Sequence, residues 1–214
     1  MKQLFNTLII SILTLLLASC SKEDTIEDFP SAITELVEMN TNSEKAVVSI
    51  RTDRGETFSV TNTSMKTATA DTTYRCLCIY EKVNNTSVRI YQTSAIFSML
   101  PLTPEKFTSH PKAPVKIISQ WPTDRYINLY LSYMTVGADK HAFGFCEEKV
   151  ETESDGKQTV YVSLLHKHPV SDTDAYTQKL YMSVPTYEYA KTYDNIVFTV
   201  NTYDGPVEFK YTLR

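Results

Sequence analysis

Three histidines carry the residue types and spacing that could bind a metal ion. His166 and His168 lie two residues apart in a strand-like run, so both imidazoles share one face. They could chelate zinc if His141 or the carboxylates that follow, Asp172 and Asp174, lay nearby. Against this reading, Pro169 ends the strand, and histidines near a loop commonly bond only the backbone. We therefore expect no metal and no cofactor, with His166, His168 and His141 as the weak candidates.

The first cysteine of the chain, Cys20, lies in a sequence typical of lipid attachment. Lys2, an apolar run and Leu17-Ala18-Ser19-Cys20 describe a lipoprotein signal peptide, in which the Cys20 thiol accepts a diacylglycerol. The apolar run is shorter than the roughly 20 residues that a membrane-spanning helix needs. We expect residues 1–19 to be removed and the lipid on Cys20 to hold the protein in the membrane.

The segment after Cys20 bears on the location. Ser21-Lys22-Glu23-Asp24 resembles the acidic export signal of surface lipoproteins in Bacteroides-type bacteria. Residues 20–29 are thus expected to form a tether on an outer-membrane protein displayed at the cell surface. Attachment to the periplasmic leaflet is the alternative, because a lipid anchor needs a polar lead in either place.

Two short tripeptides raise the possibility of modification. Asp24-Thr25-Ile26 and Asp71-Thr72-Thr73 resemble the acceptor motif of Bacteroides-type O-glycosylation, with Thr25 and Thr72 as acceptors. Both fall in segments predicted to be tether or loop.

The remaining cysteines, Cys76, Cys78 and Cys146, are three thiols and cannot all pair. Cys76 and Cys78 sit on one face of a predicted strand, too far apart for easy disulfide geometry. We interpret all three as small buried apolar residues.

Composition limits the class of protein. The chain carries 21 basic and 25 acidic residues, a net charge of −4. Nucleic acid is not expected as a partner, because binding it needs a clustered basic face. The 14 tyrosines and only 5 glycines favour strands over helices.

Alternating apolar residues and turn signals predict an all-β chain. The turn Asp53-Arg54-Gly55-Glu56 and the pair Asn84-Asn85 each predict a hairpin in the first half. The proline-rich stretch Pro101 to Pro114 is interpreted as a linker between domains. About seven strand candidates follow it, as in a β-sandwich.

Four sequence segments together resemble one family. They are the Cys20 motif, the run 51–55 that leads to Phe58, Trp121 with Tyr126-Ile127-Asn128-Leu129 after it, and the run 164–168. This pattern is similar to that of the NigD-like lipoproteins, a family named from a bacteriocin-associated operon. The resemblance implies an N-terminal OB-like barrel (residues 30–112) followed by a C-terminal immunoglobulin-like β-sandwich (residues 113–214).

These observations predict a non-enzymatic surface lipoprotein that binds a glycan or a protein partner at the cell envelope. Tyrosines with one exposed face could stack on sugars; the candidates are Tyr126, Tyr130, Tyr133, Tyr161, Tyr176, Tyr181, Tyr187, Tyr189 and Tyr193. A bacteriocin-immunity or envelope-protection protein is one alternative. A metal-dependent hydrolase built on His166 and His168 is the other.

Overall fold

The computed structural model describes residues 31–62, 66–67, 69–135, 141–169 and 176–213. Nearly all of its regular structure is strand, which confirms the all-β prediction. Apart from the strands, the described residues form two short 3₁₀ turns, Pro104–Lys106 and Tyr189–Lys191. No helix in the described part of the chain is long and apolar enough to span a membrane.

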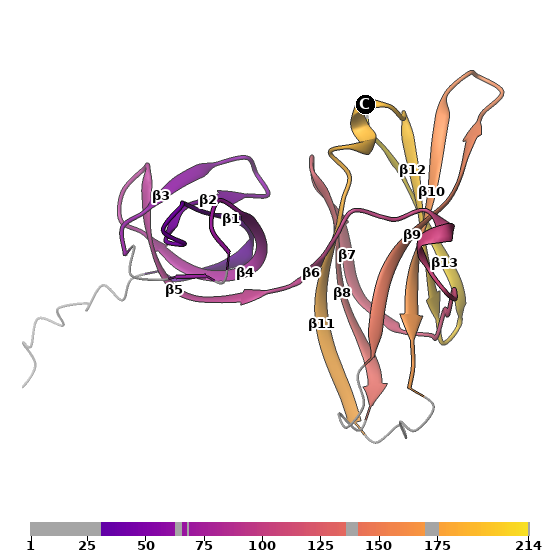
Figure 1. Cartoon of the computed structure of the whole chain (residues 1–214), viewed down its shortest axis with the longest axis horizontal. Coiled ribbons are helices and arrows are strands. Elements are labelled where there is room, and N and C mark those ends of the chain that lie inside the picture. Colours follow the sequence, from indigo (N-terminus) through magenta and orange to yellow (C-terminus); the bar gives the residue numbers. More distant parts are fainter. Residues whose placement is uncertain (1–30, 63–65, 68, 136–140, 170–175, 214) are drawn as a thin grey trace, which may run out of the picture. The chain divides into compact units, whose positions relative to one another are not determined.

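The first five strands close into a barrel (Figure 1). In chain order they are β1 (Ile33–Thr41), β2 (Val47–Thr52), β3 (Thr57–Val60), β4 (Thr73–Lys82) and β5 (Ser87–Ala95). Each strand pairs with its neighbour in the order β1-β2-β3-β5-β4, and β4 pairs back to β1. This closed five-stranded arrangement matches the expected OB-like barrel.

Turn residues explain how the barrel strands connect. Gly55 joins β2 to β3 with φ of +85°, a conformation that costs a residue with a Cβ atom and that glycine adopts freely. Asn84 makes the β4–β5 turn, where its side chain accepts a hydrogen bond from the Thr86 amide. Both predicted hairpins are confirmed.

The other strands form two four-stranded sheets packed face to face (Figure 1). One sheet has the order β13-β12-β10-β9 and the other β6-β11-β8-β7. The strands are β6 (Phe97–Ser98), β7 (Lys116–Pro122), β8 (Tyr126–Thr135), β9 (Ala142–Thr152), β10 (Gln158–Lys167), β11 (Tyr176–Pro185), β12 (Asn195–Thr202) and β13 (Gly205–Thr212).

Alternation along these strands builds the core of the sandwich. Leu129 and Leu131 of one sheet meet Val160, Phe198 and Val200 of the other, and all five are fully or almost fully buried. A separate apolar cluster fills the barrel, with Val37, Ile50 and Cys78 at its centre. The chain therefore has two hydrophobic cores, one in the barrel and one between the sheets.

The proline-rich segment 101–114 differs from the predicted linker. The amide of Leu102 donates to the carbonyl of Phe145, and the amide of Ala113 donates to the carbonyl of His166. The strand before it, β6, pairs with β11 of the sandwich, although the sequence had suggested that this strand belonged with the barrel. Proline prevents the segment from forming a regular strand, but Leu102 still bonds the outer edge of β9, and residues 111–113 bond β10 at His166.

Candidate functional site

The open side of the sandwich carries the most developed candidate site, a groove between the sheet edges β7 and β13. Each of these strands is the last in its sheet, so within the described residues each has a neighbouring strand on one side only. At one end of the gap the Val115 amide donates to the Asn201 carbonyl, and at the other end the Tyr211 hydroxyl bonds the Gln120 side chain. We call the space between these two links the β7–β13 groove.

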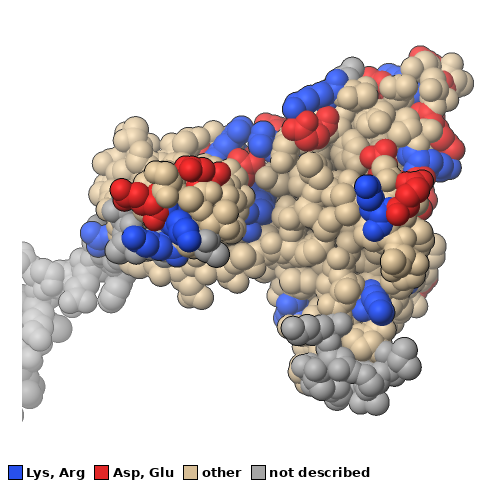
Figure 2. Space-filling view, viewed as in Figure 1, with Lys and Arg blue, Asp and Glu red and all other residues tan. Residues whose placement is uncertain are grey.

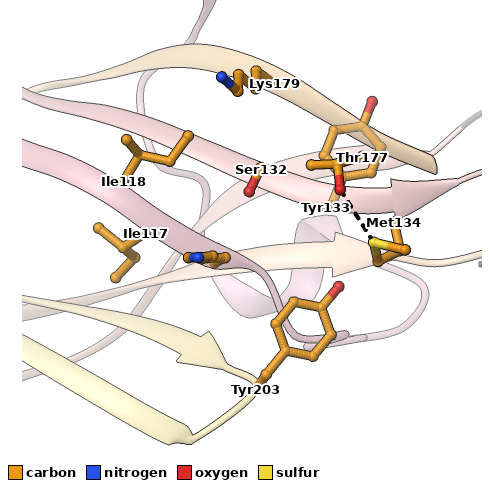
Figure 3. A pocket seen from close by; sticks show the side chains of 9 residues that line it. Ile117, Ile118, Ser132, Tyr133, Met134, Thr177, Lys179 and Tyr203 are labelled. Carbon is orange, nitrogen blue, oxygen red and sulfur yellow. Dashed lines mark hydrogen bonds between the residues drawn. The ribbon is translucent and has the colours of Figure 1, made fainter.

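Two adjoining cavities make up the groove. The first, of about 480 Å³, lies over the sheet face next to the β7 edge. It is lined by Lys116, Ile117 and Ile118 of β7, by Ser132 and Met134 of β8, by Thr177 and Lys179 of β11, and by Tyr203, among others. In Figure 3, Tyr203 lies on the opposite side of this cavity from Lys179. The second cavity, of about 680 Å³, shares Lys116, Ile117 and Tyr203 with the first and extends to Val207 and Phe209. The shared residues make the two cavities one continuous surface.

Large apolar side chains remain exposed along this groove. Ile118 is 42% exposed, Tyr203 52% and Val207 38%. Ile118 stands out because β7 bulges between Ile117 and Ser119, where the pairing with β8 shifts. Exposed apolar side chains next to unpaired strand edges are typical of a surface that another chain covers.

The charge of the groove is opposite in sign to that of the whole chain. Lys116 and Lys179 line it, and neither forms an ion pair within the described part of the protein. Asp204 contributes one carboxylate at the turn between β12 and β13. Elsewhere, on the face shown in Figure 2, Lys and Arg alternate with Asp and Glu instead of gathering into a patch of one sign.

The three histidines do come together, at the end of the sheet where β9 begins and β10 ends. His166 is buried, and its ring stacks on Phe143 with the centroids 4.5 Å apart. His166 Nδ1 lies 3.1 Å from the Ala113 carbonyl, which only accepts, so this nitrogen carries the proton. His166 Nε2 then accepts from His141 Nδ1 at 2.8 Å. His168 bonds the Pro169 carbonyl.

This geometry ties the histidines to the backbone and to one another. Burial lowers the pKa of His166 to about 4, so its ring is neutral near pH 7. Within the described residues, no three His, Cys, Asp or Glu side chains are grouped so that they could hold a metal ion. Asp172 and Asp174, the carboxylates considered with them, lie outside the described residues.

The three cysteine thiols are free and buried, at positions 76, 78 and 146. Burial raises the pKa of Cys76 to about 11, of Cys78 to about 12 and of Cys146 to about 11. They are protonated at neutral pH and pack as small apolar groups, as the sequence indicated.

The predicted modification sites fall in different places. Cys20 and Thr25 lie outside the described residues. Thr72 is half-buried beside β4, where its hydroxyl donates to the Ala70 carbonyl and its amide donates to the Thr41 hydroxyl. O-glycosylation of Thr25 and Thr72 stays a prediction.

The tyrosines divide by burial. Tyr126, Tyr133 and Tyr189 are buried, whereas Tyr130 and Tyr181 stack on each other with the centroids 4.3 Å apart. Burial covers the first three rings, and stacking covers one face of each of the other two. Two tyrosines line the groove: Tyr133, a candidate from the sequence that is 8% exposed, and Tyr203, which the sequence did not point out.

A buried arginine forms a network that the sequence did not reveal. Arg75 of β4 is 7% exposed and holds the Asp53 carboxylate through Nη2, at 2.6 and 2.8 Å. The same nitrogen bonds Asn128 of β8, while Nε bonds Ser183 of β11. The guanidinium also lies 4.1 Å from the centre of the Tyr126 ring. Barrel and sandwich residues thus share one set of polar contacts, in which Arg75 is buried and the Asp53 side chain is 18% exposed.

Comparison with known proteins identifies the family. Residues 98–212 match the model of the NigD-like C-terminal beta sandwich domain, which is more than half of the chain. The chain belongs to the NigD-like family. The match begins at β6, in agreement with the pairing of that strand to the sandwich.

Solved structures extend the similarity over both parts of the chain. A NigD-like immunity protein from Bacteroides caccae is 25% identical, and the match covers 87% of this chain and 99% of that one with a TM-score of 0.68. A protein of unknown function from Bacteroides vulgatus shares the fold at 14% identity, with a TM-score of 0.65 and coverage of 85% and 90%. No curated protein matches the chain significantly.

Proposed function

We propose that this NigD-like protein is a non-enzymatic immunity protein of the cell envelope, which binds a polypeptide toxin in the β7–β13 groove. The groove carries the proposal, since it combines two unpaired strand edges, exposed apolar side chains and two lysines without ion pairs. The similarity to a NigD-like immunity protein supports the immunity role. A polypeptide is the ligand because only a peptide chain can use the backbone groups of a strand edge.

The features of the groove favour a protein partner over a glycan. Sugar binding needs tyrosine faces that are free to stack, and five of the candidate tyrosines are buried or paired with each other. The groove instead offers isoleucine, valine and phenylalanine side chains between its two edges. Such a surface suits apolar side chains of a polypeptide.

The lipid anchor is the second part of the proposal. Diacylglycerol on Cys20 would keep the protein in the outer membrane, at the cell surface, where a secreted toxin arrives first. The anchor needs no cofactor and no catalytic step. Protection would follow from capture of the toxin before it reaches its target.

A challenge assay tests this function. A strain that lacks the gene is exposed to purified antagonistic polypeptides of related strains, with and without a copy of the gene. We expect the deletion to sensitise the cells to at least one polypeptide and the wild-type gene to restore resistance. Equal survival of the deletion strain under every polypeptide would refute the immunity role.

Variants in the same assay connect resistance to the groove. Lys116→Glu combined with Lys179→Glu reverses the charge of the groove and should abolish protection. Lys106→Glu combined with Lys157→Glu changes the net charge equally at exposed positions that do not line the groove, and should protect like the wild type. Cys20→Ser should lower protection by releasing the protein from the membrane.

A further inference from the structure

Among the strands that the structure describes, none pairs with the outer edge of β13. β13 (Gly205–Thr212) pairs with β12 over eight residues without a bulge, and the order of the sheet leaves its other side open. We infer that an extended segment of the polypeptide partner adds to this edge as a fifth strand of the sheet. This inference rests on the proposed function and specifies how the partner is held.

The hydrogen-bond pattern shows which backbone groups of β13 are available. In an antiparallel pair, successive residues alternate between bonding the neighbour strand and pointing away from it. The Leu213 amide donates to the Asp194 carbonyl, so residue 213 bonds the β12 side. Counting back in steps of two along the unbroken register, the amides of Glu208, Lys210 and Thr212 point outward.

Pro206 agrees with this alternation. It lies opposite Asn201, in the same phase as Glu208, where its missing N–H removes no bond to β12. The Asn201 carbonyl accepts from Val115, on the side of β12 away from β13. The position of Pro206 and the direction of the Asn201 carbonyl therefore each support the same set of outward-pointing amides on β13.

The facing edge, β7, is less suited to accept a strand. Its pairing with β8 shifts at Ile118, and it ends at Pro122, which has no amide hydrogen. A bulge within the strand disrupts a regular ladder of hydrogen bonds, whereas Pro206 lies at the start of β13 and leaves three outward amides beyond it. The partner strand is therefore assigned to β13, with β7 as the opposite wall of the groove.

The chemistry of the groove predicts the sequence of the added strand. Val207 and Phe209 of β13 point into the groove, so every second side chain of the added strand points there as well. These side chains should be apolar, to cover Val207, Phe209 and Ile117. Lys116 lines both cavities without an ion pair, and it calls for a carboxylate on the same partner segment.

A synthetic peptide tests strand addition apart from the immunity role. The probe is an eight-residue peptide with blocked ends, in which valine alternates with serine and one valine is replaced by glutamate, so that its carboxylate lies on the face that meets Lys116. It is titrated into the mature chain carrying Cys20→Ser and followed by backbone amide NMR. We expect saturable shifts on β13 and slower hydrogen exchange at the amides of Glu208, Lys210 and Thr212. The same peptide with lysine in place of glutamate should bind at least tenfold more weakly.

A matched pair of variants isolates the backbone contribution. Glu208→Pro removes one outward amide, leaves the bonds to β12 intact, and should weaken peptide binding about fivefold or more. Glu208→Ala keeps the amide and should bind within twofold of the wild type. Lys210→Pro repeats the test at the next outward position if Glu208→Pro fails to fold.

Three results would overturn strand addition: protection on β7 instead of β13, no binding at 1 mM peptide, or equal binding by the proline and alanine variants. The challenge assay then separates the two proposals. A protein that protects cells through the groove lysines but shows no β13 protection keeps its immunity role and loses this binding mode.

Discussion

Acidification should destabilise this protein through one buried histidine. His166 has a pKa of about 4 in the folded protein because burial disfavours its charged form, whereas the unfolded chain has the ordinary value near 6.5. Between these two values the unfolded chain binds the proton and the folded protein does not. Stability from this residue is therefore complete above about pH 6.5 and is lost as the pH falls toward 4.

The size of the effect follows from the pKa difference. A difference of one pKa unit corresponds to about 1.4 kcal/mol, so a fall from 6.5 to about 4 is worth about 3 kcal/mol. The contacts of His166 lead to the same conclusion, because a second proton on Nε2 would face the proton on His141 Nδ1 and break their 2.8 Å hydrogen bond.

Urea unfolding between pH 7 and pH 4 measures this loss. The wild type should lose about 3 kcal/mol more of its unfolding free energy over this range than His166→Gln, which has no proton to take up. His110→Gln replaces an exposed histidine and should follow the wild-type curve. If His166→Gln lost stability in parallel with the wild type, the argument from burial would be refuted.

Two other expected outcomes concern buried groups. Arg75→Met removes the charged partner of the Asp53 carboxylate, which keeps only its hydrogen bond from Asn128, and should lower the unfolding free energy by about 3 to 5 kcal/mol in urea. Arg89→Met, at a half-exposed pair, should change it by less than about 1 kcal/mol. Equal losses in the two variants would contradict the buried network. The thiols of Cys76, Cys78 and Cys146 should resist a disulfide reagent at pH 8 in the folded protein. All three should react in denaturant without reductant. Rapid reaction of the native protein would show that the thiols are accessible.

Local signals in the sequence were sufficient for most of the strands and for the two hairpin turns of the barrel. The alternation along Tyr126–Thr135 and the glycine at Gly55 each depend on neighbouring residues, so both could be read without knowledge of the fold. The segment 101–114 could not, because its role depends on bonds to Phe145 and His166, which lie far along the chain. Proline content alone suggested a linker, while the remaining amides pair with the sandwich.

The groove was missed for the same reason. One wall comes from Lys116–Ile118 and the other from Tyr203–Phe209, and only the sheet order brings them together. Lysine and isoleucine in a predicted strand look like ordinary surface and core residues. The network of Arg75 was equally hidden, since an arginine within a strand gives no sign of burial.

The most direct test of the central claim is the affinity of the mature chain for a polypeptide that kills the deletion strain. Calorimetric titration should give saturable binding with one polypeptide per protein. Lys116→Glu combined with Lys179→Glu should weaken it at least tenfold, while Lys106→Glu combined with Lys157→Glu leaves it unchanged. Binding that is equally strong in both double variants would contradict the assignment of the groove as the toxin-binding site.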